Sequence, residues 1–128
     1  TYALNFRIRD NRLNMSVSMR SQDAAFGLGN DAPAFSFLQE MVFNELLLSY
    51  SDLRLGVYHH HADSFHIYER HFKMLDEMIK PDAIFTDVRC PKISGADEVM
   101  ALRLLHTMTD DKKAWLPEHF AFTRWLLS

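Results

Sequence analysis

The stretch that decides the fold is YALNFRIR-DNR-LNMSVSM, residues 2–19. On either side of the polar triplet Asp10-Asn11-Arg12, apolar residues alternate with smaller or polar ones, which is the period of a half-buried strand. Because the triplet supplies a turn, we predict a β-hairpin. Arg20 and Ser21 follow at the end of the second strand, where a strand gives way to a loop and side chains can converge on a ligand.

Helix and strand patterns continue beyond the hairpin. The segment from Gly27 to Asp31 reads as a turn in which Gly27 and Gly29 permit close backbone approach to a ligand. Pro33 stands where a helix would begin, and the apolar spacing after it predicts that helix. The predicted elements are helices over 34–49, 68–79, 96–106 and 118–127, and strands over 53–61 and 83–85.

Composition limits the class of protein. With 128 residues and 48% hydrophobic content, the chain is one domain's worth of sequence with enough apolar surface for a core. A net charge of −3 gives no support to nonspecific nucleic-acid binding, so local arginines would have to hold an anionic substrate. A single cysteine excludes an internal disulfide framework and suits a reducing cytoplasm. No apolar run reaches the ~18 residues of a spanning helix, so we expect a cytoplasmic protein without a membrane partner.

The segment Arg20-Ser21-Gln22-Asp23, with Asp31 shortly after it, gathers groups that suit a phosphorylated ligand. Arg20 offers a planar fork that matches a phosphate, and Ser21 adds a hydroxyl donor. Asp23 and Asp31 could address the polar edges of whatever carries the phosphate. The same residue types also occur in ordinary turns and caps, so the cluster alone does not decide between the two roles.

Several blocks carry a family resemblance. They are FRIRDNRL at 6–13, MRSQD at 19–23, FGL at 26–28, DLRLG at 52–56, HIY at 66–68 and His71. Their order and spacing resemble the second half of thymidylate synthases from Thr1 to about Leu75, whereas residues 81–128 show no clear match. Within the family, the details are more similar to the phage-type deoxycytidylate hydroxymethylases, because Met19 stands where synthases usually carry Gln.

Asp31 stands where synthases carry an Asn that reads the uracil edge. Uracil presents an acceptor at position 4 and a donor at position 3, which an amide complements. Cytosine presents an amino donor at position 4 and an acceptor at position 3. A carboxylate accepts from the amino group, and a proton shared with Asp31 can bridge to ring N3. Asp31 therefore favours a cytosine nucleotide.

The resemblance implies a fold and a set of site residues. The fold would be α+β, with a mixed sheet covered by helices and a sheet face that forms a homodimer. Arg20 and Ser21 would grip the nucleotide phosphate, and His66 with Tyr68 would hold the sugar 3′-hydroxyl. The folate would be contacted by Asp23 and Gly27.

In this family the nucleophile is a cysteine, expected immediately before Thr1. We therefore expect residues 1–128 to be the C-terminal portion of one domain in a longer polypeptide, with no catalytic residue of their own. The missing thiolate would add to C6 of the pyrimidine, so that C5 attacks the one-carbon unit of 5,10-methylenetetrahydrofolate. Water capture would give a 5-hydroxymethyl product, whereas hydride delivery would give a methyl group.

The function that the sequence predicts is a 5-hydroxymethyltransferase that converts dCMP or CMP with 5,10-methylenetetrahydrofolate and no metal. One alternative is a thymidylate synthase-like methyltransferase acting on dUMP. Another is a family member that binds nucleotides without turnover. Asp31→Asn would separate a cytosine preference from a uracil preference.

Two other groups have weaker functional interpretations. His59, His60 and His61 invite a zinc site, but a strand would turn His60 away from its neighbours and no metal-ligand motif accompanies them. We expect them to line or neighbour the nucleotide pocket. The lone Cys90 is expected to be an ordinary small residue rather than a nucleophile.

Overall fold

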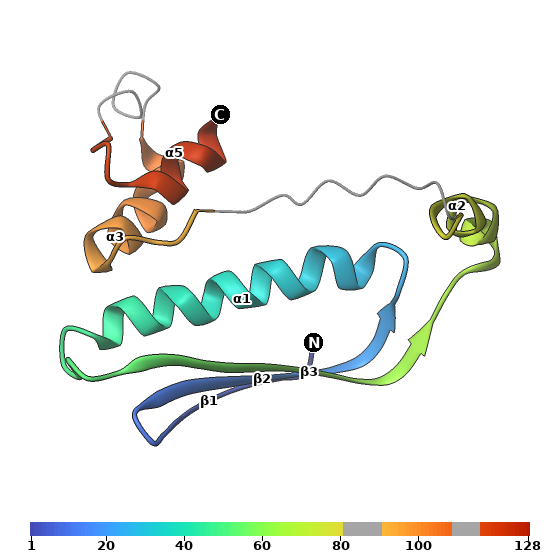
Figure 1. The fold of residues 1–128 in the computed structure, drawn as a ribbon, viewed down its shortest axis with the longest axis horizontal. Coiled ribbons are helices and arrows are strands. Elements are labelled where there is room, and N and C mark those ends of the chain that lie inside the picture. Colours follow the sequence, from blue (N-terminus) through green and yellow to red (C-terminus); the bar gives the residue numbers. More distant parts are fainter. Residues whose placement is uncertain (81–90, 109–115) are drawn as a thin grey trace.

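The computed structural model describes residues 1–80, 91–108 and 116–128. It has three layers: a three-stranded sheet, the long helix α1 (Gly27–Leu46) across one face of that sheet, and a C-terminal group of helices on the other side of α1 (Figure 1). The strands are β1 (Ala3–Arg9), β2 (Arg12–Asp23) and β3 (Arg54–His66), in that spatial order. The predicted α+β class is confirmed.

The predicted hairpin is confirmed as β1 and β2, which pair antiparallel from Ala3↔Ser18 to Arg9↔Arg12. Asp10 and Asn11 form its two-residue turn, with φ angles of 50° and 55°. Positive φ at both central positions is the geometry of a type I′ turn, whose twist matches that of the strands. Asp and Asn tolerate this backbone region better than other residues with side chains, so the local sequence explains the turn.

The third strand makes the sheet mixed, because β3 pairs parallel to β2 from Arg12↔Arg54 to Asp23↔His66. A parallel pair needs a crossover connection, and α1 supplies it. The register shifts once, between the pairs Leu13↔Leu55 and Met15↔Tyr58. At this irregularity the Gln39 side chain donates to the Leu13 carbonyl at 2.8 Å, and Asn14 Oδ1 accepts from the Val57 N–H at 2.9 Å. These side chains satisfy backbone groups that the ladder leaves unpaired.

One core lies between the sheet and α1. The alternating residues Leu13, Met15 and Val17 of β2 are at most 1% exposed. Met15, Val17 and Met19 pack with partly buried apolar residues of α1 and β3, namely Phe35, Leu38, Tyr58 and Ala62. Burial of a side chain of this size contributes about 1.5–3 kcal/mol, so β2 is the strand on which the sheet depends. The apolar residues of β1 remain partly exposed, because α1 lies over β2 and β3.

The prediction of a turn from Gly27 to Asp31 is wrong: α1 begins at Gly27, and Pro33 lies inside the helix. The helical bond from the Asn30 N–H to the Phe26 carbonyl, at 3.2 Å, is already formed in this segment. Pro33 removes one internal hydrogen bond, which normally ends a helix. Here packing on both sides of α1 outweighs that loss, since tertiary contacts rather than propensity supply most helix stability.

The remaining helices follow the predicted positions with shorter bounds. They are the 3₁₀ turn η1 (Glu69–His71), α2 (Phe72–Met78), α3 (Ala96–Leu104), the 3₁₀ turn η2 (Leu105–Thr107) and α5 (Ala121–Leu127). The strand predicted at 83–85 lies outside the described residues, as does Cys90. Within the described ranges, no helix is long and apolar enough to cross a bilayer.

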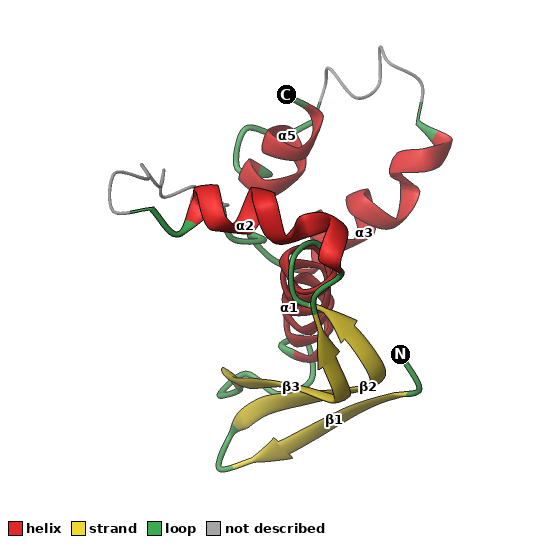
Figure 2. Ribbon diagram, turned by 90° about the vertical axis from the view of Figure 1, so that its right-hand side faces the viewer, coloured by secondary structure: helices red, strands yellow, loops and turns green. Residues whose placement is uncertain are grey.

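The helices α3 and α5 lie on the side of α1 opposite the sheet (Figure 2), and a second core lies between them and α1. Ile93, Val99 and Phe122 are buried against Phe37 and Met41 of α1. Polar contacts reinforce this docking: the Ile93 N–H donates to Glu40 Oε1 at 2.8 Å, and Arg103 pairs with Glu45 at 3.0 Å. Helix α1 is therefore shared by two cores, one with the sheet and one with the C-terminal helices.

Glu98 of α3 is a fully buried carboxylate at the centre of the C-terminal helices. Its oxygens accept from the Ser94 N–H at 2.6 Å and from the Thr123 N–H and hydroxyl at 2.8 and 2.9 Å. Burial alone would raise the pKa of Glu98, but the hydrogen bonds from Thr123 and Ser94 outweigh burial and hold this pKa below its usual value. Glu98 thus ties α3 to α5.

Glu98→Gln should lower the free energy of unfolding by about 1–3 kcal/mol near neutral pH, because the amide cannot accept from all of these donors. The pKa of Glu98 is lower in the folded protein, so its stabilisation is present above the unfolded-state value of about 4.3 and is lost as pH falls through the folded-state value. Urea unfolding at decreasing pH should therefore show the two proteins converging. The exposed Glu118→Gln is the matched control, and a difference that stayed constant with pH would contradict this account.

Candidate functional site

Three chain segments meet at one end of the sheet: the carboxyl ends of β2 and β3 and the first turns of α1 (Figure 1). This meeting follows from parallel pairing, which brings the carboxyl ends of both strands to the same edge. Asp23 and His66 are register partners there, and the Ala24 N–H donates to the His66 carbonyl at 2.8 Å. The predicted site residues from 20 to 31 and from 66 to 68, far apart in sequence, therefore gather at one end.

Arg20 and Ser21 lie near the carboxyl end of β2, shortly before the chain turns into α1. Arg20 is exposed, and Ser21 is partly buried beside its register partner Ser64. In the part of the chain that the structure describes, Arg20 has no ion-pair partner. The first turn of α1 carries no acidic residue, so its N–H groups and partial positive charge are uncompensated by side chains. Arg20 and the start of α1 thus carry positive charge at this end of the sheet, which also holds the carboxylates of Asp23 and Asp31.

Asp31 lies on the second turn of α1 and is partly buried. The side chain of Gln22 crosses from β2 and donates from Nε2 to Asp31 Oδ2 at 2.9 Å. Gln22 itself is only 2% exposed. Among the described residues, the second oxygen of Asp31 has no hydrogen-bond partner, so it can accept from a ligand.

Gln22 also connects Asp31 to β3. Gln22 Oε1 lies 3.0 Å from His60 Nε2, and His60 Nδ1 lies 2.5 Å from the Tyr58 hydroxyl. Burial raises the pKa of Tyr58, and the negative charge of Asp31 raises it further. The phenol therefore keeps its proton in the physiological range and remains a donor.

Asp23 and Gly27 have local structural tasks at this edge. Asp23 Oδ1 accepts from the Ala25 N–H at 3.0 Å, a turn that leads the chain from β2 towards α1. A Cβ at Gly27 would lie 2.7 Å from Gln22 Nε2 and 3.3 Å from Asp23 Cβ. Glycine at position 27 therefore leaves the space that the Gln22 amide occupies. This structural reason for glycine differs from the predicted one, which was close approach of a ligand.

An aromatic group follows β3. His66 and Tyr68 meet edge to face with ring centroids 4.9 Å apart, so the structure brings this predicted pair together. Arg70 lies over the Tyr68 ring at 4.6 Å, and His71 packs edge to face on Phe26 at 4.8 Å. His71 Nδ1 is buried and has no hydrogen-bond partner among the residues that the structure describes. The group joins the segment after β3 to the start of α1.

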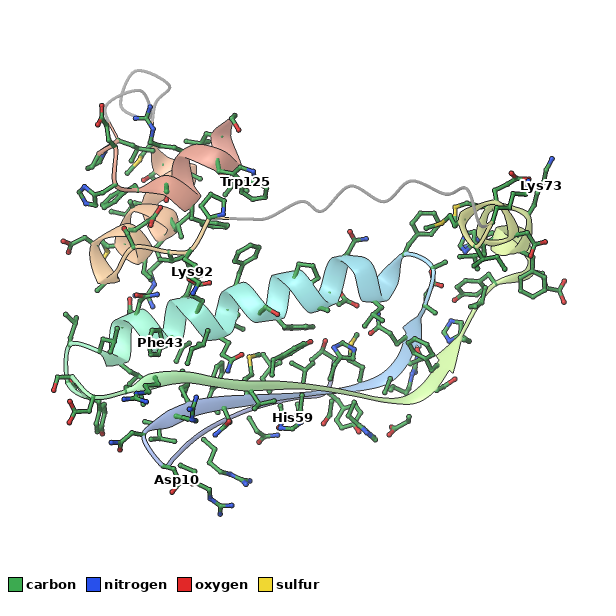
Figure 3. All side chains as sticks on the ribbon, viewed as in Figure 1. Asp10, Phe43, His59, Lys73, Lys92 and Trp125 are labelled. Carbon is green, nitrogen blue, oxygen red and sulfur yellow. The ribbon has the colours of Figure 1, made fainter. Side chains whose placement is uncertain are left out.

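The histidine run alternates across the sheet as predicted. His60 faces α1, whereas His59 lies on the face away from that helix (Figure 3). His61 pairs with Asp63 at 3.1 Å on the exposed side. In the described ranges, no group of three or more His, Cys, Asp or Glu side chains is placed to hold a metal ion.

Two surface hollows lie away from this edge. One, of about 640 Å³, is lined by the hairpin turn and by residues 51–54 at the opposite end of β2. The other, of about 230 Å³, lies on the outer face of the sheet between Arg7, Ser16 and His59. The first is a wide polar depression between loops, and the second includes His59 of the histidine run. The predicted residues Arg20, Ser21, Asp31, His66 and Tyr68 line neither hollow.

The sequence analysis missed Gln22, Tyr58 and Arg70 as members of this group. Alternation along β3 could have placed Tyr58 with His60, since the two are two positions apart and therefore share a face of the strand. Gln22 could not be found in this way. The buried residues of β2 have odd numbers up to Met19, and Gln22 breaks this parity.

Comparisons with known proteins agree with the resemblance. A family model described as thymidylate synthase matches residues 1–101, which extends past the segment in which the sequence motifs were traced. The deoxycytidylate 5-hydroxymethyltransferase of Enterobacteria phage T4 is 30% identical over 82 residues, 62% of this chain and 33% of the phage protein. The corresponding protein of phage T2 is 31% identical over 78 residues, 59% of this chain and 32% of its own length. The chain thus spans about a third of the length of these curated relatives. Since the family model covers most of its residues, the chain belongs to the thymidylate synthase family.

Proposed function

We propose that this chain provides the nucleotide-binding edge of a pyrimidine-nucleotide 5-hydroxymethyltransferase. Its substrate would be dCMP or CMP, and the one-carbon donor would be 5,10-methylenetetrahydrofolate. Family membership and the similarity to two phage deoxycytidylate 5-hydroxymethyltransferases support a transferase of this kind. The choice of cytosine rests on the position and chemistry of Asp31, and the hydroxymethyl product rests on the similarity to the phage proteins.

The observation that carries the proposal is the hydrogen bonding of the Asp31 carboxylate. Gln22 donates to one of its oxygens at 2.9 Å, which orients the carboxylate. The second oxygen is an acceptor, and the amino group of cytosine is a donor. A carbonyl in the same place, as in uracil, would put two acceptors against each other and leave both unpaired, which costs about 1–3 kcal/mol. Asp31 therefore favours cytosine.

For the other groups we propose the roles that the family resemblance implies. The exposed guanidinium of Arg20 and the hydroxyl of Ser21, near the carboxyl end of β2, would bind the phosphate. His66 and Tyr68, held edge to face, would bind the sugar hydroxyl. Asp23 has one oxygen bound to the Ala25 N–H, and its other oxygen would accept from an N–H of the pterin. Gly27, adjacent in space to Asp23, would let the pterin approach the backbone.

The nucleophile that must add to C6 is not among the residues gathered at this edge. The chain's part of the reaction is to hold the pyrimidine so that C5 faces the one-carbon unit, which 5,10-methylenetetrahydrofolate supplies when bound. A proton shared between Asp31 and ring N3 would make C6 a better electrophile. The outer sheet face, with Asn5, Arg7, Ser16 and His59 around its hollow, is the surface that we propose for a homodimer. The protein would work in the cytoplasm.

Turnover tests the function directly. The protein is purified in the form that its source organism makes, so that any nucleophile preceding Thr1 is included. It is incubated with 5,10-methylenetetrahydrofolate and either dCMP or dUMP, and the product is identified by mass spectrometry. We expect a hydroxymethyl product from dCMP. A methyl product from dUMP with release of dihydrofolate would instead identify a synthase, and binding of dCMP with no product would identify a nucleotide-binding protein without turnover.

Asp31→Asn should reverse the base preference. The amide can donate to the uracil carbonyl but can no longer accept from the cytosine amino group while pairing with N3 in the same way. We expect the ratio of the dissociation constants for dUMP and dCMP to fall by about tenfold to a hundredfold, as calorimetry would measure. An unchanged ratio would remove Asp31 from base recognition. Asp63→Asn, on the exposed end of β3, is the control.

Arg20→Gln should weaken binding of dCMP by about tenfold or more, because a charge-assisted bidentate contact to the phosphate would be lost. Binding of deoxycytidine, which lacks the phosphate, should be unaffected by the same change. Arg12→Gln alters an exposed arginine at the other end of β2 and should leave both affinities unchanged. Equal weakening of nucleotide and nucleoside would show that Arg20 acts through the structure of the edge and not on the phosphate.

A further inference from the structure

Four polar side chains from three elements form one continuous hydrogen-bonded chain between the sheet and α1. Asp31 accepts from Gln22 at 2.9 Å, Gln22 Oε1 lies 3.0 Å from His60 Nε2, and His60 Nδ1 lies 2.5 Å from the Tyr58 hydroxyl. Gln22 comes from β2, His60 and Tyr58 from β3, and Asp31 from α1. The chain ends on the carboxylate to which we assign the base.

The donor and acceptor inventory fixes the direction of this chain. An ionised carboxylate can only accept, so the amide of Gln22 turns its nitrogen towards Asp31. Its oxygen then faces His60 and accepts, which requires the proton of the neutral imidazole to be on Nε2. Nδ1 is left as an acceptor for the Tyr58 hydroxyl. All three donors therefore point the same way, towards Asp31, and each bond polarises the next.

Reversing the chain requires linked changes. If Asp31 were protonated and donated to Gln22, the amide would have to rotate by half a turn and the His60 proton would have to move to Nδ1. Gln22 has little room for this, because it is only 2% exposed and Gly27 lies against its nitrogen. The Phe35 ring of α1 is tilted against the His60 ring, with the ring centroids 6.4 Å apart. Asp31 is the charged group at the end of the hydrogen-bonded chain. The arrangement therefore selects Asp31 as an acceptor.

We infer that Gln22 is a specificity-determining positioning residue, which holds Asp31 as an oriented acceptor through the His60 tautomer and the Tyr58 hydroxyl. The inference rests on the proposed function in one respect, the binding of a base by Asp31. Its ligand class is a nucleobase with an amino donor on its edge. The consequence is that discrimination between cytosine and uracil depends on residues that do not touch the base.

The first experiment needs no nucleotide. Long-range nitrogen–proton NMR of the labelled protein reports which nitrogen of His60 carries the proton. We expect Nε2. A His60 protonated on Nδ1 in the unmodified protein would overturn the inference.

Two variants test the coupling in the same spectra. Gln22→Leu removes the acceptor for His60 Nε2, so the tautomer preference should be lost. Gly27→Ala keeps all four residues of the chain but puts a methyl group 2.7 Å from Gln22 Nε2, so the amide must move and the His60 signals should shift. Gly29→Ala is its control, because a Cβ at 29 meets nothing within 4 Å. If His60 kept its tautomer in Gln22→Leu, the hydrogen-bonded chain would not determine that tautomer, and the inference would fail.

The second experiment measures discrimination, as the ratio of the dissociation constants for dUMP and dCMP. Gln22→Leu should lower this ratio by about tenfold, chiefly through weaker binding of dCMP, since a released carboxylate loses its orientation. A residue that only supported the fold would weaken both nucleotides equally. An unchanged ratio in Gln22→Leu would therefore sink the inference.

The two experiments separate the two proposals. If the unmodified protein bound dCMP and dUMP equally, the proposed function would fail, while the His60 spectra would still decide whether Gln22 orients Asp31. If the unmodified protein preferred dCMP and Gln22→Leu kept that preference, the proposed function would stand and the role of Gln22 would fail.

Discussion

The parallel pairing of β2 and β3 is the constraint on which the rest of the described structure depends. Two strands that run the same way need a crossover, and α1 spans the whole length of the pair to make it. The pairing fixes where the two strands end, and the crossover fixes where the helix begins. All three points coincide at one edge. No single motif creates the candidate site, because an arginine, a carboxylate and an aromatic pair arrive there from different parts of the chain.

The sequence predicted the hairpin well because its signals are local, whereas β3 extends to His66, beyond the predicted end at residue 61. Alternation over residues 2–19 and the polar triplet at 10–12 determine the hairpin without help from distant residues. The start of α1 was not predictable in the same way. Gly27, Gly29 and Pro33 each argue against a helix locally, and the helix exists because two apolar surfaces pack on it. Tertiary contacts outweigh propensity in such a segment.

The candidate site shows the same difference between features that the sequence predicts and features that depend on tertiary contacts. The residues with expected roles were predicted from the family resemblance, and the structure places them at one end of the sheet. Gln22 was passed over as a spacer between Ser21 and Asp23. Its importance comes from a change in strand parity after Met19 and from the space that Gly27 leaves, neither of which a linear pattern contains. A supporting residue of this kind is recognised only when its partners from other elements are known.

The position of α1 between two cores has a consequence for cooperativity. The sheet buries Phe35 and Leu38 of this helix, and the C-terminal helices bury Phe37 and Met41. If either the sheet or the C-terminal helices separated from α1, apolar side chains of α1 would become exposed. The remaining layer helps to hold α1 in the position that buries those side chains. The helix therefore joins the sheet and the C-terminal helices into one folding unit. As a result, the structure of the sheet edge beside the first turn of α1 is linked to helices at the other end of the sequence.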